Sequence, residues 1–199
     1  MGGEALHAHI LHFCNSRWKG EREIPRDWVD ADVVNIYKRK GSKKDPNNYR
    51  GIFLLDTIGK IYASMVCSRL NVHIEKGMSA TQHGFRKGMS TEQAVLGIRR
   101  LIQIAIDQKS QIYLVFVDLR KAFDPLPRNA IMERLRELKT SWNVLHSIEK
   151  LLKCPKGRIK GSNESFPMER GVRQGSKEGP TIFNIVFQMI LEETYNALP

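Results

Sequence analysis

The sequence predicts an α+β fold in which an antiparallel or mixed sheet is covered by helices on one face. Two runs rich in β-branched and aromatic residues, separated by a polar loop, are typical of a β-hairpin. Other segments repeat apolar residues at the spacing of an amphipathic helix. Helices and strands mix without the strict alternation that indicates a parallel sheet, which favours the α+β class.

The composition is that of a globular protein with an excess of positive charge. The chain has 199 residues, enough for one domain or two closely packed lobes. It carries 32 Lys and Arg residues against 21 Asp and Glu residues, a formal net charge of +11 at pH 7. Because a positive potential concentrates phosphates near the surface, we expect a polyanionic partner, with nucleic acid ahead of an anionic membrane surface.

Cysteine and histidine usage indicates neither a disulfide framework nor a zinc site. The cysteines are odd in number and far apart, which predicts a reducing compartment. On a helix, His9 and His12 would point away from His7 and Cys14, so we expect ordinary histidines there. No apolar stretch reaches the roughly 18 residues of a membrane span, and the N-terminus lacks a signal-peptide pattern. We therefore expect a soluble, intracellular protein without a membrane partner.

The first part of the chain predicts a helix and a basic hairpin. Residues 4–18 indicate a short helix that ends near Gly20. Strands are expected over residues 33–37 and in YRGIFLL, residues 49–55. The tip of the resulting hairpin carries five cations: Lys38, Arg39, Lys40, Lys43 and Lys44.

Two amphipathic helices are predicted next. Over residues 57–70, apolar side chains recur at helical spacing: Ile58, Ile61, Tyr62, Met65 and Val66. A loop with HGFRKG follows. Ser90 then has a capping-box partner in Gln93 and begins a long helix to about Asp107. Its apolar face consists of Ala94, Ile98, Leu101 and Ala105.

An almost unbroken apolar run, residues 112–117, ends at Asp118 and predicts a buried strand. Burying a carboxylate without partners is costly, so we expect a cation at its end: an Arg or Lys, a helix N-terminus or a divalent metal. The alternative is that Asp118 only ends the strand and turns the chain. The basic pair Arg120 and Lys121, followed by Phe123, suits a site where phosphates, metal and a flat ring or sugar meet.

The remaining sequence predicts three helices and a second hairpin. Helices are expected over residues 128–139 and 142–153, and GRIKGSNESFPMERGV, residues 157–172, indicates the hairpin. The first of these helices turns three apolar residues inward: Ile131, Leu135 and Leu138. A final helix starts at Pro180. Its apolar residues are Ile182, Phe183, Val186, Phe187 and Ile190.

Four motifs in this order resemble the reverse transcriptases of non-LTR (LINE-type) retrotransposons. FVDLRKAFD is similar to the family's first catalytic motif, in which a buried strand delivers an aspartate to two Mg²⁺ ions. DADVVNIYKRKG with NNYRGIFLL is similar to the fingers motifs, and GFRKGMST resembles the GFR-x-G-x-ST segment. GVRQGSKEGPTIFN resembles the motif that begins Gly-Val-x-Gln-Gly and ends Phe-Asn. The resemblance covers about residues 23–190.

This resemblance implies a fragment of a right-hand polymerase. It divides the chain into an N-terminal helical extension at 1–22, a fingers-like region at 23–110 and a partial palm at 111–199. The implied activity is RNA-directed DNA polymerisation, with Mg²⁺ (or Mn²⁺) as cofactor, an RNA template, a DNA primer and deoxynucleoside triphosphates. Asp118 and the backbone carbonyl of Leu119 are implied as metal ligands.

The resemblance also implies nucleotide contacts. Phe123 takes the position of a steric gate, a ring beneath the sugar that leaves no room for a 2′-hydroxyl, although a core phenylalanine is the alternative. Lys38, Lys40 and Arg50 align with the cations that grip the triphosphate, and a guanidinium suits bidentate phosphate contact. A solvated charged turn is the alternative for the hairpin tip.

Two further pairs of residues follow from the same motifs. Gln174 resembles the residue that packs over the nucleotide sugar, and Gly175 permits close approach of the backbone. Arg86 and Lys87 are expected either to touch template phosphate or to lie in a surface loop.

The match falls short at the metal site. One carboxylate cannot hold two ions about 3.5 to 4 Å apart, and the family's aromatic-Ala-Asp-Asp hairpin is absent from this sequence. We therefore expect the chain to be inactive on its own. Smaller departures are Gly51, where relatives usually have Pro, and the run Lys177, Glu178 and Gly179, where they have an apolar or Pro-containing stretch.

Two other hypotheses remain. The chain could be a non-catalytic nucleic-acid-binding remnant of a retrotransposon, or an unrelated basic α+β adaptor. The nucleus and the cytoplasm are both compatible with the sequence, and the oligomeric state does not follow from it.

Overall fold

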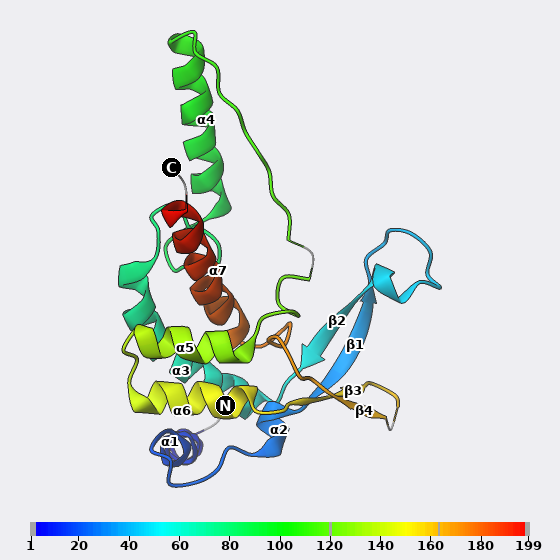
Figure 1. Ribbon diagram of the computed structural model, residues 1–199. Coiled ribbons are helices and arrows are strands. Elements are labelled where there is room, and N and C mark those ends of the chain that lie inside the picture. Colours follow the sequence, from blue (N-terminus) through cyan, green and yellow to red (C-terminus); the bar gives the residue numbers. More distant parts are fainter. Residues whose placement is uncertain (1–2, 120, 163, 198–199) are drawn as a thin grey trace.

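A four-stranded mixed sheet joins the N-terminal hairpin to a second hairpin from the last part of the chain (Figure 1). The computed structural model describes residues 3–119, 121–162 and 164–197, so Arg120 lies outside the described residues. The strands follow the order β2-β1-β3-β4, and the predicted α+β class is confirmed. Their bounds are β1 (Ala31–Tyr37), β2 (Tyr49–Leu54), β3 (Lys156–Ile159) and β4 (Ser165–Pro167).

Strands β1 and β2 form the predicted basic hairpin, with antiparallel pairing up to Tyr37 and Tyr49 at its tip. The two tyrosine rings lie 5.4 Å apart. The Tyr49 hydroxyl donates a hydrogen bond to the carbonyl of Lys43 at 2.9 Å, and the Tyr37 hydroxyl donates to the carbonyl of Gly41. These bonds tie the basic tip back to the strands, so its cations are carried on an ordered loop.

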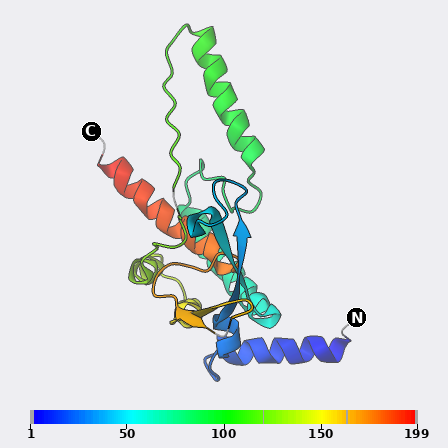
Figure 2. The same ribbon diagram turned by 90° about the vertical axis from the view of Figure 1, so that its right-hand side faces the viewer.

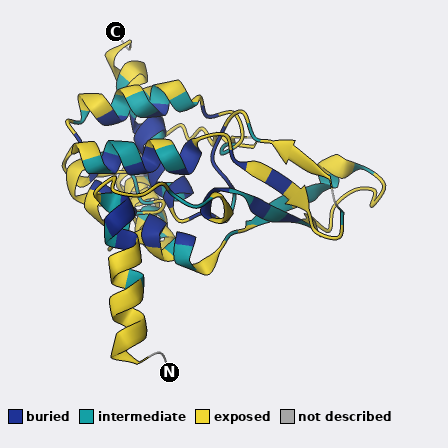
Figure 3. Ribbon diagram, turned by 90° about the horizontal axis from the view of Figure 1, so that it is seen from below, coloured by how far each residue is buried: buried dark blue, intermediate teal, exposed yellow. Residues whose placement is uncertain are grey.

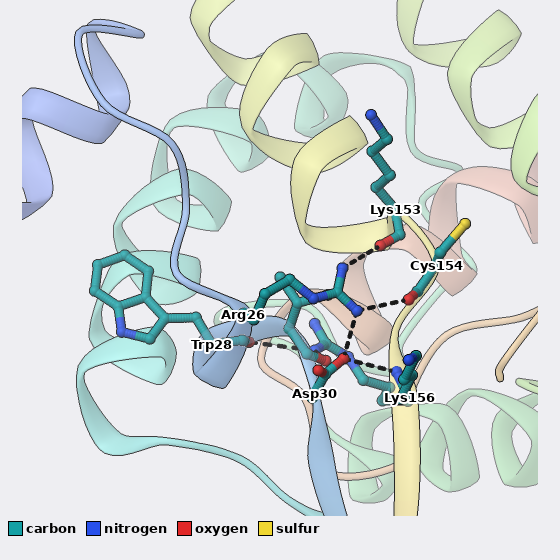
Figure 4. Close-up of polar contacts among 8 residues, drawn as sticks. Arg26, Trp28, Asp30, Lys153, Cys154 and Lys156 are labelled. Atoms are coloured by element: carbon teal, nitrogen blue, oxygen red, sulfur yellow. Dashed lines mark hydrogen bonds and ion pairs between the residues drawn. The ribbon is translucent and has the colours of Figure 1, made fainter. Parts of the chain in front are cut away.

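The first contacts between β1 and β3 are made by side chains (Figure 4). Asp30 accepts hydrogen bonds from Arg26 and from the backbone N–H of Lys156, both at 2.8 Å. Arg26 also donates to the carbonyl oxygens of Lys153, at 3.5 Å, and Cys154, at 3.0 Å. The polar groups at the start of this strand pair therefore have partners where the regular ladder has not yet begun.

The second hairpin, β3–β4, lies where the sequence predicted it, and it joins the first hairpin through a parallel pair. Ala31 of β1 stands opposite Gly157 of β3. The sheet thus contains strands from both sides of residue 110. The division into an extension, a fingers-like region and a partial palm stays a prediction.

The predicted helices are all present, together with one short helix at residues 26–29 that was not predicted, and most of the helices pack together at one end of the sheet (Figures 1 and 3). They are α1 (Glu4–Trp18), α2 (Arg26–Val29), α3 (Thr57–Ile74), α4 (Thr91–Asp107), α5 (Arg128–Glu137), α6 (Trp142–Leu152) and α7 (Glu178–Asn196). Two 3₁₀ turns, Pro46–Asn48 and Glu75–Gly77, lie in the connections. Within the described part of the chain, no helix is long and apolar enough to cross a membrane.

The core lies between α3, α5, α6 and α7. Tyr62 of α3 is fully buried, and its hydroxyl lies 2.7 Å from the Ser147 hydroxyl of α6. Fully buried apolar residues from the other helices belong to the same cluster, among them Leu135, Ile148 and Ile182. The predicted inward position of Ile61 is wrong, since this residue is 44% exposed.

Helix α4 projects away from the rest of the molecule (Figures 1 and 2). The predicted capping box is confirmed: the Ser90 hydroxyl accepts from the N–H of Gln93 at 3.3 Å, and the Gln93 side chain accepts from the N–H of Ser90 at 2.9 Å. The predicted apolar face is present but largely uncovered, with Ile98 37% and Leu101 54% exposed. Local capping and spacing therefore determine this helix more than burial does.

The strand predicted over residues 112–117 is wrong. The whole segment from 110 to 119 has no regular secondary structure, and all of it is exposed, with Val115 at 87% and Phe116 at 83%. A strand requires a neighbour for its backbone N–H and C=O groups, and none of the strands in the described residues pairs with this run. Asp118, at its end, is exposed and does not close a core strand.

Candidate functional site

A pocket of about 510 Å³ opens between the β1–β2 hairpin and the loop that follows residue 118. Five of the residues predicted to bind nucleotide line it: Lys38, Arg50, Leu119, Phe123 and Gln174. Lys40, in contrast, is exposed at the hairpin tip and does not line the pocket. The fold therefore brings three separate motifs of the sequence to one cavity.

One face of the hairpin forms a wall of this pocket. Directly paired residues of an antiparallel ladder share a face, and the pairs Val33–Phe53 and Asn35–Gly51 both line the cavity. A Cβ atom at Gly51 would lie 3.3 Å from the Val33 side chain. Gly51, which departs from the family pattern, has no side chain and so leaves space in this wall beside Val33 and Asn35.

The chemistry of the lining suits a ligand that combines negative charge with a flat apolar part. Its cations are Lys38, Arg50 and Lys121, and its one acid among the lining residues is Asp124. The Lys38 ammonium donates to the carbonyl of Asn47 at 2.9 Å, which fixes its position at the mouth of the hairpin. Aromatic rings add the apolar surface: Tyr49, Phe53, Phe123 and Phe166. A nucleoside triphosphate has both features.

The Gly-Val-x-Gln-Gly loop connects the two walls through backbone hydrogen bonds. The N–H of Val172 donates to the carbonyl of Phe123 at 3.0 Å, on the side of the loop after residue 118. The carbonyl of Gln174 accepts from the N–H of Phe53 at 2.9 Å, on the hairpin side. A shift of this loop would therefore change the distance between the walls.

Both glycines of this motif are required by its conformation. Gly171 has φ +72° and Gly175 has φ +112°, in the region that disfavours residues with a Cβ atom. A Cβ atom at Gly171 would collide with the carbonyl oxygen of Phe123, and one at Gly175 would lie 2.8 Å from the carbonyl oxygen of Phe53. The expected close approach of the backbone at Gly175 is thus to β2.

Phe123 contacts both the pocket and the core. Its ring is half-buried, and its centroid lies 5.2 Å from that of Phe183 on α7 and 6.2 Å from that of Phe85. Because the same side chain also lines the cavity, the packing against Phe183 holds the ring in place at the pocket surface.

Comparison with known proteins agrees with this arrangement of motifs. Residues 40–198, well over half of the chain, match the family described as "Reverse transcriptase (RNA-dependent DNA polymerase)". This chain belongs to the reverse transcriptase family. The resemblance to the non-LTR retrotransposon class is confirmed by the relatives of the chain.

Reverse transcriptases of mobile elements are among these relatives. The chain is 29% identical to the "Probable RNA-directed DNA polymerase from transposon BS" of Drosophila melanogaster, over 81% of this chain and 18% of that protein. It is 26% identical to the "RNA-directed DNA polymerase from mobile element jockey" of the same fly, over 81% and 18%. It is 27% identical to the Pol polyprotein from type-1 retrotransposable element R1 of Bradysia coprophila, over 86% and 17%. The chain therefore spans less than a fifth of the length of these relatives.

Glu178, in the run that departs from the reverse transcriptase pattern, forms a buried ion pair with Arg173 that sequence reasoning missed. Arg173 donates to the Glu178 carboxylate at 2.6 Å, and the side chains are 2% and 1% exposed. The same guanidinium donates to the carbonyl of Trp28 at 3.3 Å and to that of Val29. Glu178 thus neutralises a cation that would otherwise be buried without a counter-ion. An arginine five residues before an acid is too common a pattern to have indicated this pair.

The GFRKG loop of this reverse transcriptase chain is held by buried polar contacts. Arg86 pairs with Glu75 at 2.5 Å and donates to the carbonyls of Ser79, at 2.6 Å, and Gln82, at 3.0 Å. Its side chain is only 8% exposed. Both terminal nitrogens of Arg86 are thus engaged within the protein, whereas its Nε has no hydrogen-bond partner. Its contact with template phosphate stays a prediction. Lys87 is exposed, and its contact with template stays a prediction.

The predicted metal ligands are not gathered into a metal centre. Leu119 lines the pocket and Asp118 is exposed beside it in the sequence. Among the residues that the structure describes, no group of three or more His, Cys, Asp or Glu side chains could hold an ion. One carboxylate and one carbonyl are too few protein ligands for two Mg²⁺ ions, so this donor set does not fit a two-ion site. The role of Asp118 as a metal ligand stays a prediction.

Proposed function

We propose that this chain is the nucleotide-binding part of an RNA-directed DNA polymerase that copies an RNA template onto a DNA primer. The observation that carries the proposal is the pocket between the hairpin and the loop after residue 118, where cations and aromatic rings from three family motifs meet. Membership of the reverse transcriptase family supports the same reading.

Four of the lining residues have a role in this proposal. Arg50 binds the phosphates of the incoming deoxynucleotide through two parallel N–H donors, and Lys38 adds a point charge. Phe123 lies beneath the sugar and excludes a 2′-hydroxyl. Gln174 packs over the sugar from the other wall, in a position that the backbone bond to Phe53 maintains.

Nucleotide binding without polymerisation is the expected behaviour of the chain by itself. Two-metal catalysis requires more carboxylates than Asp118, and the described residues supply no such set. The exposed position of Asp118 also favours a second candidate function, a non-catalytic remnant that holds nucleic acid through its basic surface. The two functions differ in nucleotide selectivity, because only a polymerase pocket distinguishes dATP from ATP.

The test is a titration of the chain with dATP and with ATP, monitored by calorimetry or ligand-observed NMR. We expect dATP to bind more tightly than ATP. Arg50→Ala should weaken the binding of both nucleotides by roughly tenfold or more, since a charge-assisted hydrogen bond contributes about 1.5 to 3 kcal/mol. Phe123→Val should reduce the difference in affinity between dATP and ATP, because the smaller side chain leaves room for the 2′-hydroxyl.

Two control variants separate these effects from general changes in charge or packing. Lys44→Ala removes a cation from the same hairpin tip but outside the pocket lining, and it should leave both affinities nearly unchanged. Phe183→Leu alters the core side of the Phe123 packing and should lower stability more than selectivity. Equal binding of dATP and ATP by the unaltered chain, or no effect of Arg50→Ala, would rule out the polymerase pocket and favour the remnant.

A further inference from the structure

Phe85 stands at the surface next to the nucleotide pocket, although its neighbour Arg86 is withdrawn into the loop. The Phe85 side chain is 63% exposed. Its ring meets that of Phe123 edge to face, with centroids 6.2 Å apart and an angle of 74° between the planes. Because Phe123 lines the pocket, the exposed ring lies immediately outside the place proposed for the incoming nucleotide.

The backbone of Phe85 adopts a conformation that an aromatic residue rarely takes. Its φ is +56°, in the left-handed region where a Cβ atom is disfavoured. Burial of the ring does not offset this strain, because most of the side chain remains in contact with water. The surrounding structure must therefore impose the conformation.

Buried polar contacts on both sides of Phe85 impose it. On one side, the Asn184 amide donates to the carbonyl of Gly84 at 2.8 Å, from a side chain that is almost fully buried. On the other side, Arg86 is fixed by its hydrogen bonds to the carbonyls of Ser79 and Gln82. Asn184 belongs to the Phe-Asn end of the Gly-Val-x-Gln-Gly motif, so two family motifs cooperate to hold an exposed ring in a strained position.

The charges around this ring permit a polyanion to approach. Lys87 is exposed directly after Arg86. Glu75, an acid that lines the same hollow as Phe85, is 52% exposed, but the ion pair with Arg86 offsets its charge. An exposed ring beside a cation is the combination that binds single-stranded nucleic acid, because any base can stack on the ring while the cation meets the backbone.

We infer that Phe85 stacks on a base of the single-stranded template at the entrance of the nucleotide pocket. The inference rests on the proposed function for the location of the template, but the stacking itself can be measured separately. A nucleobase could also come from a free nucleotide, and the experiment below distinguishes the two sources.

The test compares two labelled DNA strands of roughly twelve nucleotides that carry the same phosphates, one of deoxyadenosine and one with abasic sites throughout. Their affinities for the 199-residue chain are measured by fluorescence anisotropy. We expect the chain to prefer the strand with bases. Phe85→Leu should reduce this preference by roughly tenfold, the equivalent of one lost stacking contact, and leave the affinity for the abasic strand unchanged. Phe85→Trp should retain the preference.

Two further variants separate stacking at Phe85 from loss of any exposed ring and from misfolding. Tyr195→Leu removes a ring of similar exposure, 65%, from the far end of α7, and it should leave the preference intact. Phe85→Asn removes the ring but suits a positive φ, so the thermal midpoint should not fall while the preference is lost. A binding loss in this variant is then not a folding defect.

The inference is overturned if Phe85→Leu keeps the wild-type preference, or if Tyr195→Leu loses it equally. It is also overturned if Phe85→Leu weakens the binding of free dATP without changing the preference for the strand with bases over the abasic strand, since the ring would then contact the mononucleotide. If instead Phe85→Leu lowers the preference while Arg50→Ala leaves dATP binding unchanged, the stacking contact stands and the proposed nucleotide pocket fails.

Discussion

The pKa of Cys67 on α3 depends on its burial and on the nearby ion pair of Arg173 and Glu178. Its side chain is 6% exposed. Burial raises the pKa of this thiol from its ordinary 9.0 to about 12; the negative charge of Glu178 adds to the effect, and a hydrogen bond with Thr181 opposes it. The thiol is therefore protonated and unreactive at neutral pH.

This shift predicts a loss of stability in alkaline solution. Above pH 9 the thiol ionises in the unfolded chain but stays protonated in the folded protein, so the free energy of unfolding should fall as the pH rises towards 12. The slope for one group is about 1.4 kcal/mol per pH unit, and below pH 9 the contribution is constant. Urea unfolding of the wild type and of Cys67→Ala at pH 8 and at pH 10.5 measures it.

Between pH 8 and pH 10.5, the free energy of unfolding of Cys67→Ala should fall less than that of the wild type, by up to about 2 kcal/mol. Burial also raises the pKa of Tyr62, and this residue acts in the same direction, but it is present in both proteins and cancels in the comparison. Parallel pH dependences would contradict the shift at Cys67.

At the scale of elements, the loop from Gly171 to Glu178 determines how the hairpin faces Phe123. Glu178→Leu leaves Arg173 buried without a counter-ion and should lower the free energy of unfolding by about 3 to 5 kcal/mol. The double variant Arg173→Met/Glu178→Leu replaces both charges by apolar groups and should recover most of the loss. Urea unfolding of the four proteins in a double-mutant cycle measures the coupling.

A control is available in an ion pair of similar length that is only partly buried. Arg134 and Glu192 lie 2.5 Å apart, but their side chains are 18% and 39% exposed. Glu192→Ala should cost less than about 1 kcal/mol, because solvent screens this pair. Equal costs for the two pairs would show that burial does not strengthen the dependence of Arg173 on its partner.

The elements that the sequence could predict are those whose causes lie within the element. The capping box at Ser90 and Gln93 is local, and the helix after it ends at the predicted residue. The run 112–117 has the composition of a strand, but a strand exists only with a partner, and the partner is not encoded in the run itself. The same limit explains the inward prediction for Ile61, whose exposure depends on which helices are adjacent.

The candidate site was predictable in part for a similar reason. The pocket residues Lys38, Arg50, Phe123 and Gln174 follow from motif resemblance, which carries spatial information that composition lacks. Contacts between distant residues have no such signal. Sequence reasoning favours Arg86 over Phe85, because charge indicates a phosphate contact and only the fold shows which of the two side chains is exposed.

At the scale of the whole molecule, part of the positive charge behind the net +11 is gathered on the hairpin tip, which hydrogen bonds hold in an ordered loop. If the tip binds nucleic acid, the affinity for a primer-template duplex should fall steeply with added salt, because each neutralised phosphate releases counter-ions. Replacing Lys40, Lys43 and Lys44 by Ala should reduce the slope of log K against log salt by about 2 to 3. Filter binding at a series of salt concentrations measures the slope.

The control variant carries the same change in net charge at exposed sites away from the tip: Lys19, Lys139 and Lys153, each replaced by Ala. It should lower affinity modestly and leave the slope nearly unchanged. The same slope reduction in both variants would indicate diffuse attraction to the whole protein and not a contact at the hairpin.

The parallel pair of β1 and β3 also sets an order of events during synthesis. Ala31 has left the ribosome long before Gly157, its partner, is made, a delay on the order of ten seconds at ordinary translation rates. Through that interval one edge of β1 is unpaired and could recruit another chain. Two acidic side chains stand there, Asp30 and Asp32, and charge on an edge discourages such pairing. Once β3 is made, Asp30 accepts a hydrogen bond from the backbone N–H of Lys156 and Asp32 forms an ion pair with Arg158, so the groups that protect the nascent edge later hold its permanent neighbour.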